Sequence, residues 1–195
     1  GGPFALPKSK RQLDSGLSHV GALRASLNRT MIRELQMHSD VLYIEEDHKV
    51  QMLREIHTPP LKLVHGLTNL IPHPPSSATG ACSDPNSFKI GLVDSGIDAS
   101  HPDLPCQNVG SSDSNCIGSE FGMPSSEHWY APTISHGTMV AGIIGAIRGN
   151  NQGISGMLDN TKVCFVVARV FSDNSGGTTM LSDILEGVYW AYQQG

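Results

Sequence analysis

Apolar residues in the first quarter of the chain recur at helical spacing within LNRTMIRELQMHSD (27–40). Positions three and four apart lie on one face of a helix, so this spacing predicts an amphipathic helix. Asn28 or Thr30 can cap its start. The next seven residues, VLYIEED, alternate apolar and polar side chains, as a half-buried strand does. The apolar positions of the predicted helix are Leu27, Met31, Ile32 and Leu35.

The spacing of apolar residues differs before and after a stretch rich in proline. Residues 57–87 hold six prolines and little periodicity, which predicts an extended surface connector. Beyond it, FKIGLVDSG (88–96) and TKVCFVVARVF (161–171) are short apolar runs of the kind that form buried parallel strands. The small apolar residues of 137–147 predict a buried helix between the two strands, and residues 105–132 have the composition of a loop.

The last segment, MLSDILEGVYWAYQQ (180–194), predicts a second helix after the glycine-containing loop SDNSGGTT. The order strand, helix, strand, helix implies a parallel sheet with right-handed crossovers. We therefore expect an α/β domain with a parallel sheet. The apolar residues on one face of the predicted helix are Leu181, Ile184, Leu185, Val188 and Tyr189.

Composition excludes several classes of protein. Hydrophobic residues make up 38% of the 195-residue chain and charged residues 16%, which argues against disorder and against a coiled coil. A net charge of −5, without a cluster of Lys and Arg, does not predict a basic surface that binds nucleic acid. No apolar run approaches the roughly 20 residues of a membrane span, so none is expected.

The four cysteines fit no metal-binding spacing such as C-x2-C. Cys106 and Cys116 close a short loop rich in Ser, Asp and Asn, which suits a disulfide in an oxidising compartment. Free thiols are the alternative.

Two residues stand where chemistry is often found. Asp94 comes at the carboxyl end of a predicted buried strand, where parallel α/β sheets place their ligand sites. His136 opens the predicted helix of small residues. Taken singly, an aspartate in Asp-Ser-Gly is often a turn cap, and a histidine at a helix start is often structural.

Taken together, these segments resemble a known family. KIGLVDSGIDASHPDL (89–104) followed by SHGTMVAGIIGA (135–146) resembles the aspartate and histidine blocks of the subtilisin-like serine proteases, in the order that this family uses. The likeness continues through GISGM, KVCFVVARVF and SDILEGVYWAY, and therefore covers nearly all of residues 88–193. Upstream, VLYIEEDHKVQML (41–53) looks like the end of the family's inhibitory propeptide.

The resemblance implies a catalytic triad of which this sequence holds two members. Asp94 is the carboxylate that orients the base, and His136 is the base that acts on a serine. No segment matches the Gly-Thr-Ser-Met-Ala block in which the family carries its nucleophile. The resemblance also implies substrate-binding positions: Ser175, Gly176 and Gly177 as an edge on which an extended peptide adds as a strand, and Phe171 in a side-chain pocket. A core phenylalanine is the alternative for Phe171.

No cofactor is implied for catalysis, but the resemblance makes a structural calcium possible. Asp103, in HPDL, matches a position that helps to bind calcium in the family. Asn150 and Asn151, in RGNNQG (148–153), stand where further oxygen ligands come from. Calcium takes six to eight oxygens, and the segment offers few carboxylates. A solvated loop is the alternative.

These observations predict a fragment of a secreted serine endopeptidase precursor. The resemblance implies that residues 1–53 form part of an α+β, ferredoxin-like inhibitory propeptide, 54–87 a Pro-rich connector, and 88–195 the N-terminal part of a doubly wound α/β catalytic domain. Its expected partners are polypeptide substrates and its own propeptide in cis, and no signal peptide is present in these residues. The alternative is a non-catalytic module that combines a propeptide-like inhibitor with a pseudoprotease.

Overall fold

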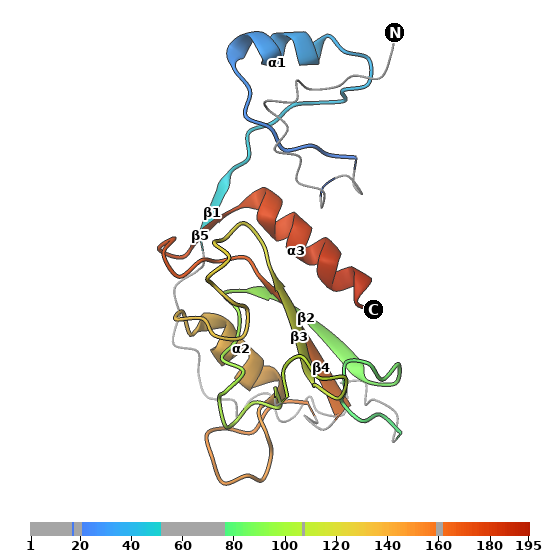
Figure 1. Cartoon of the computed structure of the whole chain (residues 1–195), viewed down its shortest axis with the longest axis vertical. Coiled ribbons are helices and arrows are strands. Elements are labelled where there is room, and N and C mark those ends of the chain that lie inside the picture. Colours follow the sequence, from blue (N-terminus) through green and yellow to red (C-terminus); the bar gives the residue numbers. More distant parts are fainter. Residues whose placement is uncertain (1–16, 18–20, 52–76, 107, 159–161) are drawn as a thin grey trace.

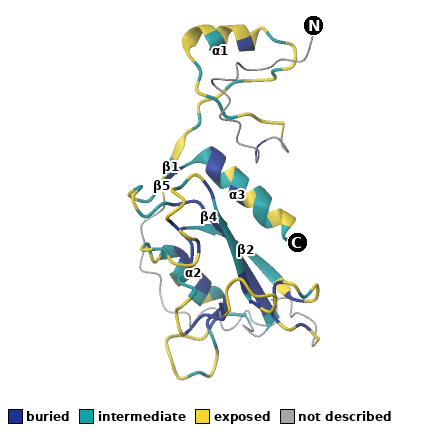
Figure 2. Ribbon diagram, in the orientation of Figure 1, coloured by how far each residue is buried: buried dark blue, intermediate teal, exposed yellow. Residues whose placement is uncertain are grey.

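A computed structural model describes residues 17, 21–51, 77–106, 108–158 and 162–195. Near its N-terminal end, helix α1 (Arg29–Gln36) lies away from the sheet (Figure 1). The Asn28 side chain caps this helix by accepting a hydrogen bond from Met31 N–H at 2.9 Å, as one of the two predicted caps. Leu35 is the buried residue of the helix, and Figure 2 shows most of the rest of it exposed.

The segment after α1 differs from the prediction. VLYIEED (41–47) forms no strand, and the neighbouring strand β1 (Lys49–Gln51) is only three residues long. Residues with alternating polarity form a strand only where a neighbouring strand supplies hydrogen bonds to their backbone N–H and C=O groups. β1 has such a neighbour, whereas 41–47 does not. β1 pairs antiparallel with β5 (Thr178–Met180), so this part of the chain is tied to the second half of the sequence rather than to a sheet of its own.

The main sheet has the order β2-β4-β3, and both of its pairings are parallel. β2 (Phe88–Asp94) and β4 (Val163–Arg169) confirm the two predicted strands. β4 is the central strand, and all seven of its residues are buried. The parallel sheet predicted from the order of elements is therefore present.

Alternate residues of β4 face two different clusters of side chains. Val163, Phe165 and Val167 belong to the cluster that includes Ala141 of helix α2 (His136–Gly145). Cys164, Val166 and Ala168 belong to two clusters against which helix α3 (Leu181–Gln193) packs through Trp190. The two helices thus cover opposite faces of the sheet, which explains the uninterrupted apolar run of β4 (Figure 2).

α3 buries only part of the predicted face: Ile184 packs against the core. Leu185 and Val188 are about half exposed, whereas Ser182, Asp183 and Gly187 are buried. A Cβ at position 187 would lie 3.0 Å from Val170 Cγ1 and 3.1 Å from Ala168 Cβ. The glycine therefore lets the helix backbone lie close to β4, and this close approach, rather than the number of apolar residues, selects the buried face.

Strand β3 (Cys116–Glu120) lies inside the region predicted to be loop. Its sequence, CIGSE, has weak strand propensity because of Gly118 and Ser119. The strand forms because it pairs with β4 and because Gly118 leaves room for Trp129: a Cβ there would come within 2.2 Å of the indole ring.

Two disulfides join the described cysteines. Cys106–Cys116 confirms the predicted pairing. Cys82–Cys164 joins the segment before β2 to β4, and Cys82 is buried. Residues 77–87, which were expected to be part of a surface connector, are therefore packed on the domain at this point. Residues 57–76 of that connector lie outside the described residues. Within the described part of the chain, no helix has the length and apolar character needed to cross a membrane.

Candidate active site

Asp94 and His136 come together although 42 residues separate them. Asp94 is the last residue of β2, and His136 is the first residue of α2. Nδ1 of His136 lies 2.9 Å from both Oδ1 and Oδ2 of Asp94. The Asp94 side chain is 14% exposed and the His136 side chain 32%, so the carboxylate is shielded while part of the imidazole reaches the surface.

Ser95 fixes the backbone on both sides of His136. Its buried hydroxyl donates a hydrogen bond to Ile134 O and accepts one from Gly137 N–H. Ser95 N–H also donates to Asp94 Oδ1 at 2.6 Å. One residue therefore positions the carboxylate and the turn that carries the imidazole.

The close packing of α2 on β2 depends on Gly137. A Cβ at this position would lie 2.1 Å from Gly96 O and 3.1 Å from Asp94 Oδ1. The glycine next to the histidine is therefore required for the approach that joins His136 to Asp94.

The arrangement determines how the imidazole can react. An ionised carboxylate only accepts hydrogen bonds, so Nδ1 of His136 carries the proton and donates a hydrogen bond to Asp94. Nε2 is then left with a lone pair that can take a proton from a hydroxyl group. This is the orientation that a general base needs.

In the structure, strand pairing begins at Thr178, directly after the predicted edge 175–177. Gly176 and Gly177 have φ values of +64° and +78°, and Ser175 lies in a turn in which Thr178 N–H donates to Ser175 O. Backbone in this left-handed region makes turns rather than strands. The extended pairing begins at β5, where Thr179 lies opposite Val50 of β1.

Charged side chains reinforce the contact between β1 and β5. Arg24 donates to Asp183 Oδ1 at 2.7 Å and contacts Asp47 Oδ2 at 3.0 Å. Asp47 also accepts hydrogen bonds from the backbone N–H and the hydroxyl of Ser182 in the first turn of α3. Asp47 thus caps a helix that follows it by more than 130 residues, where α3 has no cap from its own N-cap side chain.

Phe171, for which a pocket and a core position were both considered, is 7% exposed. It belongs to the cluster that contains Phe121 and Val170 and contacts Ile184 and Trp190. The structure therefore places it in the core.

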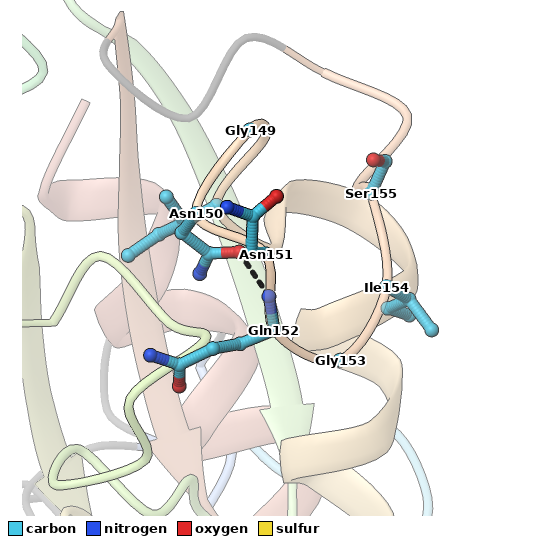
Figure 3. Close-up of a pocket in the computed structure, with 8 residues that line it drawn as sticks. Gly149, Asn150, Asn151, Gln152, Gly153, Ile154 and Ser155 are labelled. Atoms are coloured by element: carbon cyan, nitrogen blue, oxygen red, sulfur yellow. Dashed lines mark hydrogen bonds between the residues drawn. The ribbon is translucent and has the colours of Figure 1, made fainter.

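Two of the three predicted calcium residues, Asp103 and Asn150, meet and hydrogen-bond to each other. Asp103 is 3% exposed, and its two oxygens accept hydrogen bonds from Asn150 Nδ2 and Ile154 N–H, both at 2.8 Å. Asn150 Oδ1 accepts from Gln152 N–H, as Figure 3 shows in the loop that also carries Asn151. The described residues contain no group of three His, Cys, Asp or Glu able to hold a metal.

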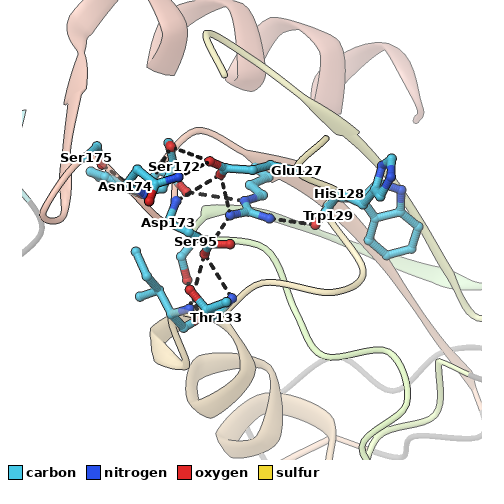
Figure 4. A network of polar contacts seen from close by, with 12 residues as sticks. Ser95, Glu127, His128, Trp129, Thr133, Ser172, Asp173, Asn174 and Ser175 are labelled. Carbon is cyan, nitrogen blue, oxygen red and sulfur yellow. Dashed lines mark hydrogen bonds and ion pairs between the residues drawn. The ribbon is translucent and has the colours of Figure 1, made fainter. Parts of the chain in front are cut away.

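A buried ionic network beside the pair was not predicted. Arg169, at the end of β4, is fully buried and contacts Glu127 and Asp173, each at 2.8 Å (Figure 4). Burial would raise the pKa of Asp173, but the hydrogen bonds from Thr133 N–H and Arg169 outweigh it, and the pKa lies below its usual value. An arginine inside the otherwise apolar run of β4 was the available signal, since a charge in a buried strand needs a partner.

Comparison with known proteins gives consistent matches. The model of the subtilase family (Peptidase_S8) matches residues 86–195. Subtilisin E of Bacillus subtilis strain 168 is 31% identical over 173 residues, which cover 89% of this chain and 39% of that protein. Halolysin of Haloferax mediterranei is 36% identical over 113 residues, which cover 56% of this chain and 20% of that protein. The chain spans about two fifths of the length of the subtilisins that it matches.

Among solved structures, the psychrophilic subtilisin-like protease Apa1 from the Antarctic Pseudoalteromonas sp. AS-11 is similar. It is 29% identical, with a TM-score of 0.45 over 60% of this chain and 23% of that protein.

Proposed function

The chain belongs to the subtilase family, and on this premise we propose that it is part of a serine endopeptidase precursor. The observation that carries the proposal is the contact of His136 Nδ1 with both oxygens of Asp94 at 2.9 Å. We assign His136 as the general base and Asp94 as the residue that orients it. The nucleophile is a serine in a segment outside these 195 residues, because no segment of the chain resembles the family's serine block.

The proposed reaction follows from the position of the imidazole. Nε2 of His136 takes the proton of the serine hydroxyl as the serine oxygen bonds to the peptide carbonyl carbon. The same proton then passes to the departing amine as the C–N bond breaks, and water repeats the sequence on the acyl-enzyme. Asp94 keeps the proton on Nδ1 and stabilises the positive charge of the imidazolium.

We propose that residues 1–53 act as an inhibitory propeptide with a ferredoxin-like fold, followed by the connector 54–87. The pairing of β1 with β5 supports this role, because it shows that β5 accepts an extended segment as an added strand, which is also how an extended peptide can bind. The contacts of Arg24 and Asp47 with α3 support docking in cis.

We further propose that the precursor is secreted. Both pairs of cysteines form disulfides, and disulfides persist mainly in oxidising compartments. The alternative function, a non-catalytic inhibitor fused to a pseudoprotease, is not favoured by the similarity to subtilisins over most of the chain.

The proposal is tested in the complete precursor that contains this chain. Asp94→Asn is expected to lower kcat by about four orders of magnitude, because His136 would be held in the wrong tautomer. His136→Ala should be at least as damaging, and the 195-residue chain alone should not hydrolyse casein. Asp98→Asn is the matched control, since the Asp98 carboxylate contacts Ser100 rather than His136. More than a tenth of the parent rate in either active-site variant would contradict the assignment.

A further inference from the structure

Arg169 lies at the point where the candidate active site joins the main sheet. In the register of the sheet, Arg169 is opposite Asp94 on one side and Glu120 on the other. Its side chain has no exposed surface, and a buried charge is strongly unfavourable without partners. Its guanidinium donates to Phe171 O, to His128 O and to Glu127 Oε2, and contacts Asp173 Oδ1 (Figure 4).

Glu127 fixes the chain between β4 and β5. One carboxylate oxygen accepts the Ser172 hydroxyl at 2.7 Å and the Asn174 side-chain amide at 3.3 Å. The other accepts Asp173 N–H at 2.9 Å in addition to Arg169. Residues 172–174 lead through a turn into Thr178, where β5 begins. A buried carboxylate therefore holds the segment that leads into β5.

Asp173 fixes the second segment, the residues just before His136. Its Oδ1 accepts hydrogen bonds from Thr133 N–H at 2.9 Å and from Ile134 N–H at 3.4 Å. Ile134 is also the residue whose carbonyl accepts the hydroxyl of Ser95. The backbone that enters His136 is thus bonded from both sides, by Ser95 beside Asp94 and by Asp173 beyond β4.

The network contains two carboxylates and one guanidinium, so the cation alone cannot neutralise it. Backbone and side-chain donors stabilise the second negative charge, and these donors belong to the two segments that the network connects. Breaking such a network at one member leaves the others with buried, unmatched groups. A displacement of either segment therefore affects the other.

We propose that Asp173, Glu127 and Arg169 are positioning residues that link the peptide-pairing strand β5 to the base His136. The inference rests on the proposed function of His136. Asp173 holds the turn that carries the imidazole, Glu127 holds the turn that carries β5, and Arg169 joins the two carboxylates. Neither carboxylate contacts the Asp94–His136 pair directly, so both act through the backbone.

The test uses NMR of the 195-residue chain, which needs no nucleophile. The Nδ1 proton of His136, hydrogen-bonded to Asp94, is assigned by its disappearance in Asp94→Asn. Asp173→Asn is expected to weaken or broaden this resonance and to speed amide exchange of Thr133 and Ile134 by about tenfold or more, because a charged acceptor is lost. Glu127→Gln is expected to speed exchange of the β5 amides and, because Glu127 contacts both Arg169 and Asp173 N–H, to broaden the His136 resonance to a smaller extent than Asp173→Asn does.

Asp84→Asn is the matched control, because Asp84 also accepts backbone N–H groups, from Thr79 and Asn86, but belongs to neither segment. The proposal fails if Asp173→Asn leaves the His136 proton and the two amides unchanged. It also fails if both network variants raise amide exchange only to the same extent throughout the chain, as a loss of global stability does, and Asp84→Asn gives the same pattern. A resonance that survives Asp94→Asn would instead refute the proposed catalytic pair itself.

Discussion

Single residues determine whether the imidazole and the carboxylate meet. Asp94 and His136 were predictable because two short motifs carry them, each at the end of an element with a clear apolar pattern. Ser95 and Asp173 were not, because their contacts join backbone groups that are distant in sequence. No local pattern reports such contacts.

Gly137 gives the first prediction at this scale. Gly137→Ala is expected to reduce kcat of the complete precursor at least about 100-fold, because a displacement of about 1 Å in a catalytic group can cost that much. The obstructing atom, Gly96 O, is backbone and cannot turn away. Gly142→Ala in the same helix is the control, since its Cβ would meet only Ile154 Cδ1, at 3.8 Å. Equal activity of the two variants would show that the packing at Gly137 does not govern the site.

The lowered pKa of Asp173 gives the second prediction at the residue scale. Because the folded state binds the proton of Asp173 less tightly than the unfolded state, the ionised carboxylate stabilises the fold above the ordinary aspartate pKa. This contribution is lost as the pH falls through the folded-state value. The difference in free energy of unfolding between parent and Asp173→Asn should therefore be constant above about pH 5 and shrink below about pH 4. Denaturant titrations across this range measure it, and a difference that grows on acidification would contradict the linkage.

At the scale of elements, the sequence predicted the helices and strands whose own residues have a clear apolar pattern. β2, β4, α2 and α3 follow from apolar runs and small-residue spacing. β1, β3 and β5 were missed because their stability comes from a partner strand: CIGSE and TTM have little apolar character, and each pairs with a segment far away in the chain.

The two disulfides constrain elements to different extents. Cys82–Cys164 closes a separation of 82 residues and Cys106–Cys116 one of 10. Chain entropy predicts a stabilisation of about 4.5 kcal/mol for the long loop and about 2.7 kcal/mol for the short one. Replacing Cys82 and Cys164 together by Ala should therefore lower the free energy of unfolding more than replacing Cys106 and Cys116. Urea titration of both double variants checks the order, and the reverse order would contradict the entropic account.

At the scale of the whole molecule, the N-terminal residues hold to the α/β domain through a short strand and a few charges. Arg24 is placed between Asp47 and Asp183, and Asp183 is almost fully buried. Docking therefore places a cation beside a carboxylate that is almost fully buried.

This contact predicts inhibition in trans. A peptide of residues 1–53 is expected to inhibit the mature enzyme, and Arg24→Ala should weaken that inhibition by about tenfold or more, since a buried charged bond is lost. Arg29→Ala, on the exposed surface of α1, is the control. Inhibition constants from peptide hydrolysis measure both, and equal constants would exclude a role for the Arg24 contacts.

The same proposal predicts where the precursor is cut. The family pattern places cleavage near Leu53–Arg54, just beyond the last residue of β1 and outside the described residues. N-terminal sequencing of the mature enzyme checks this prediction. A mature chain that starts before residue 48 or after residue 60 would show that the boundary is misplaced.

The strand order β2-β4-β3 means that the central strand of the sheet is synthesised after both of its partners. Within the described residues, β2 and β3 pair with β4 and not with each other, yet both are made before it. β4 is completed about 75 residues after β2, which corresponds to roughly 4 to 15 s at ordinary translation rates. During that interval the nascent chain carries two strands with no partner in this sheet. Chaperones that bind exposed strands therefore have their opportunity before residue 169 leaves the ribosome.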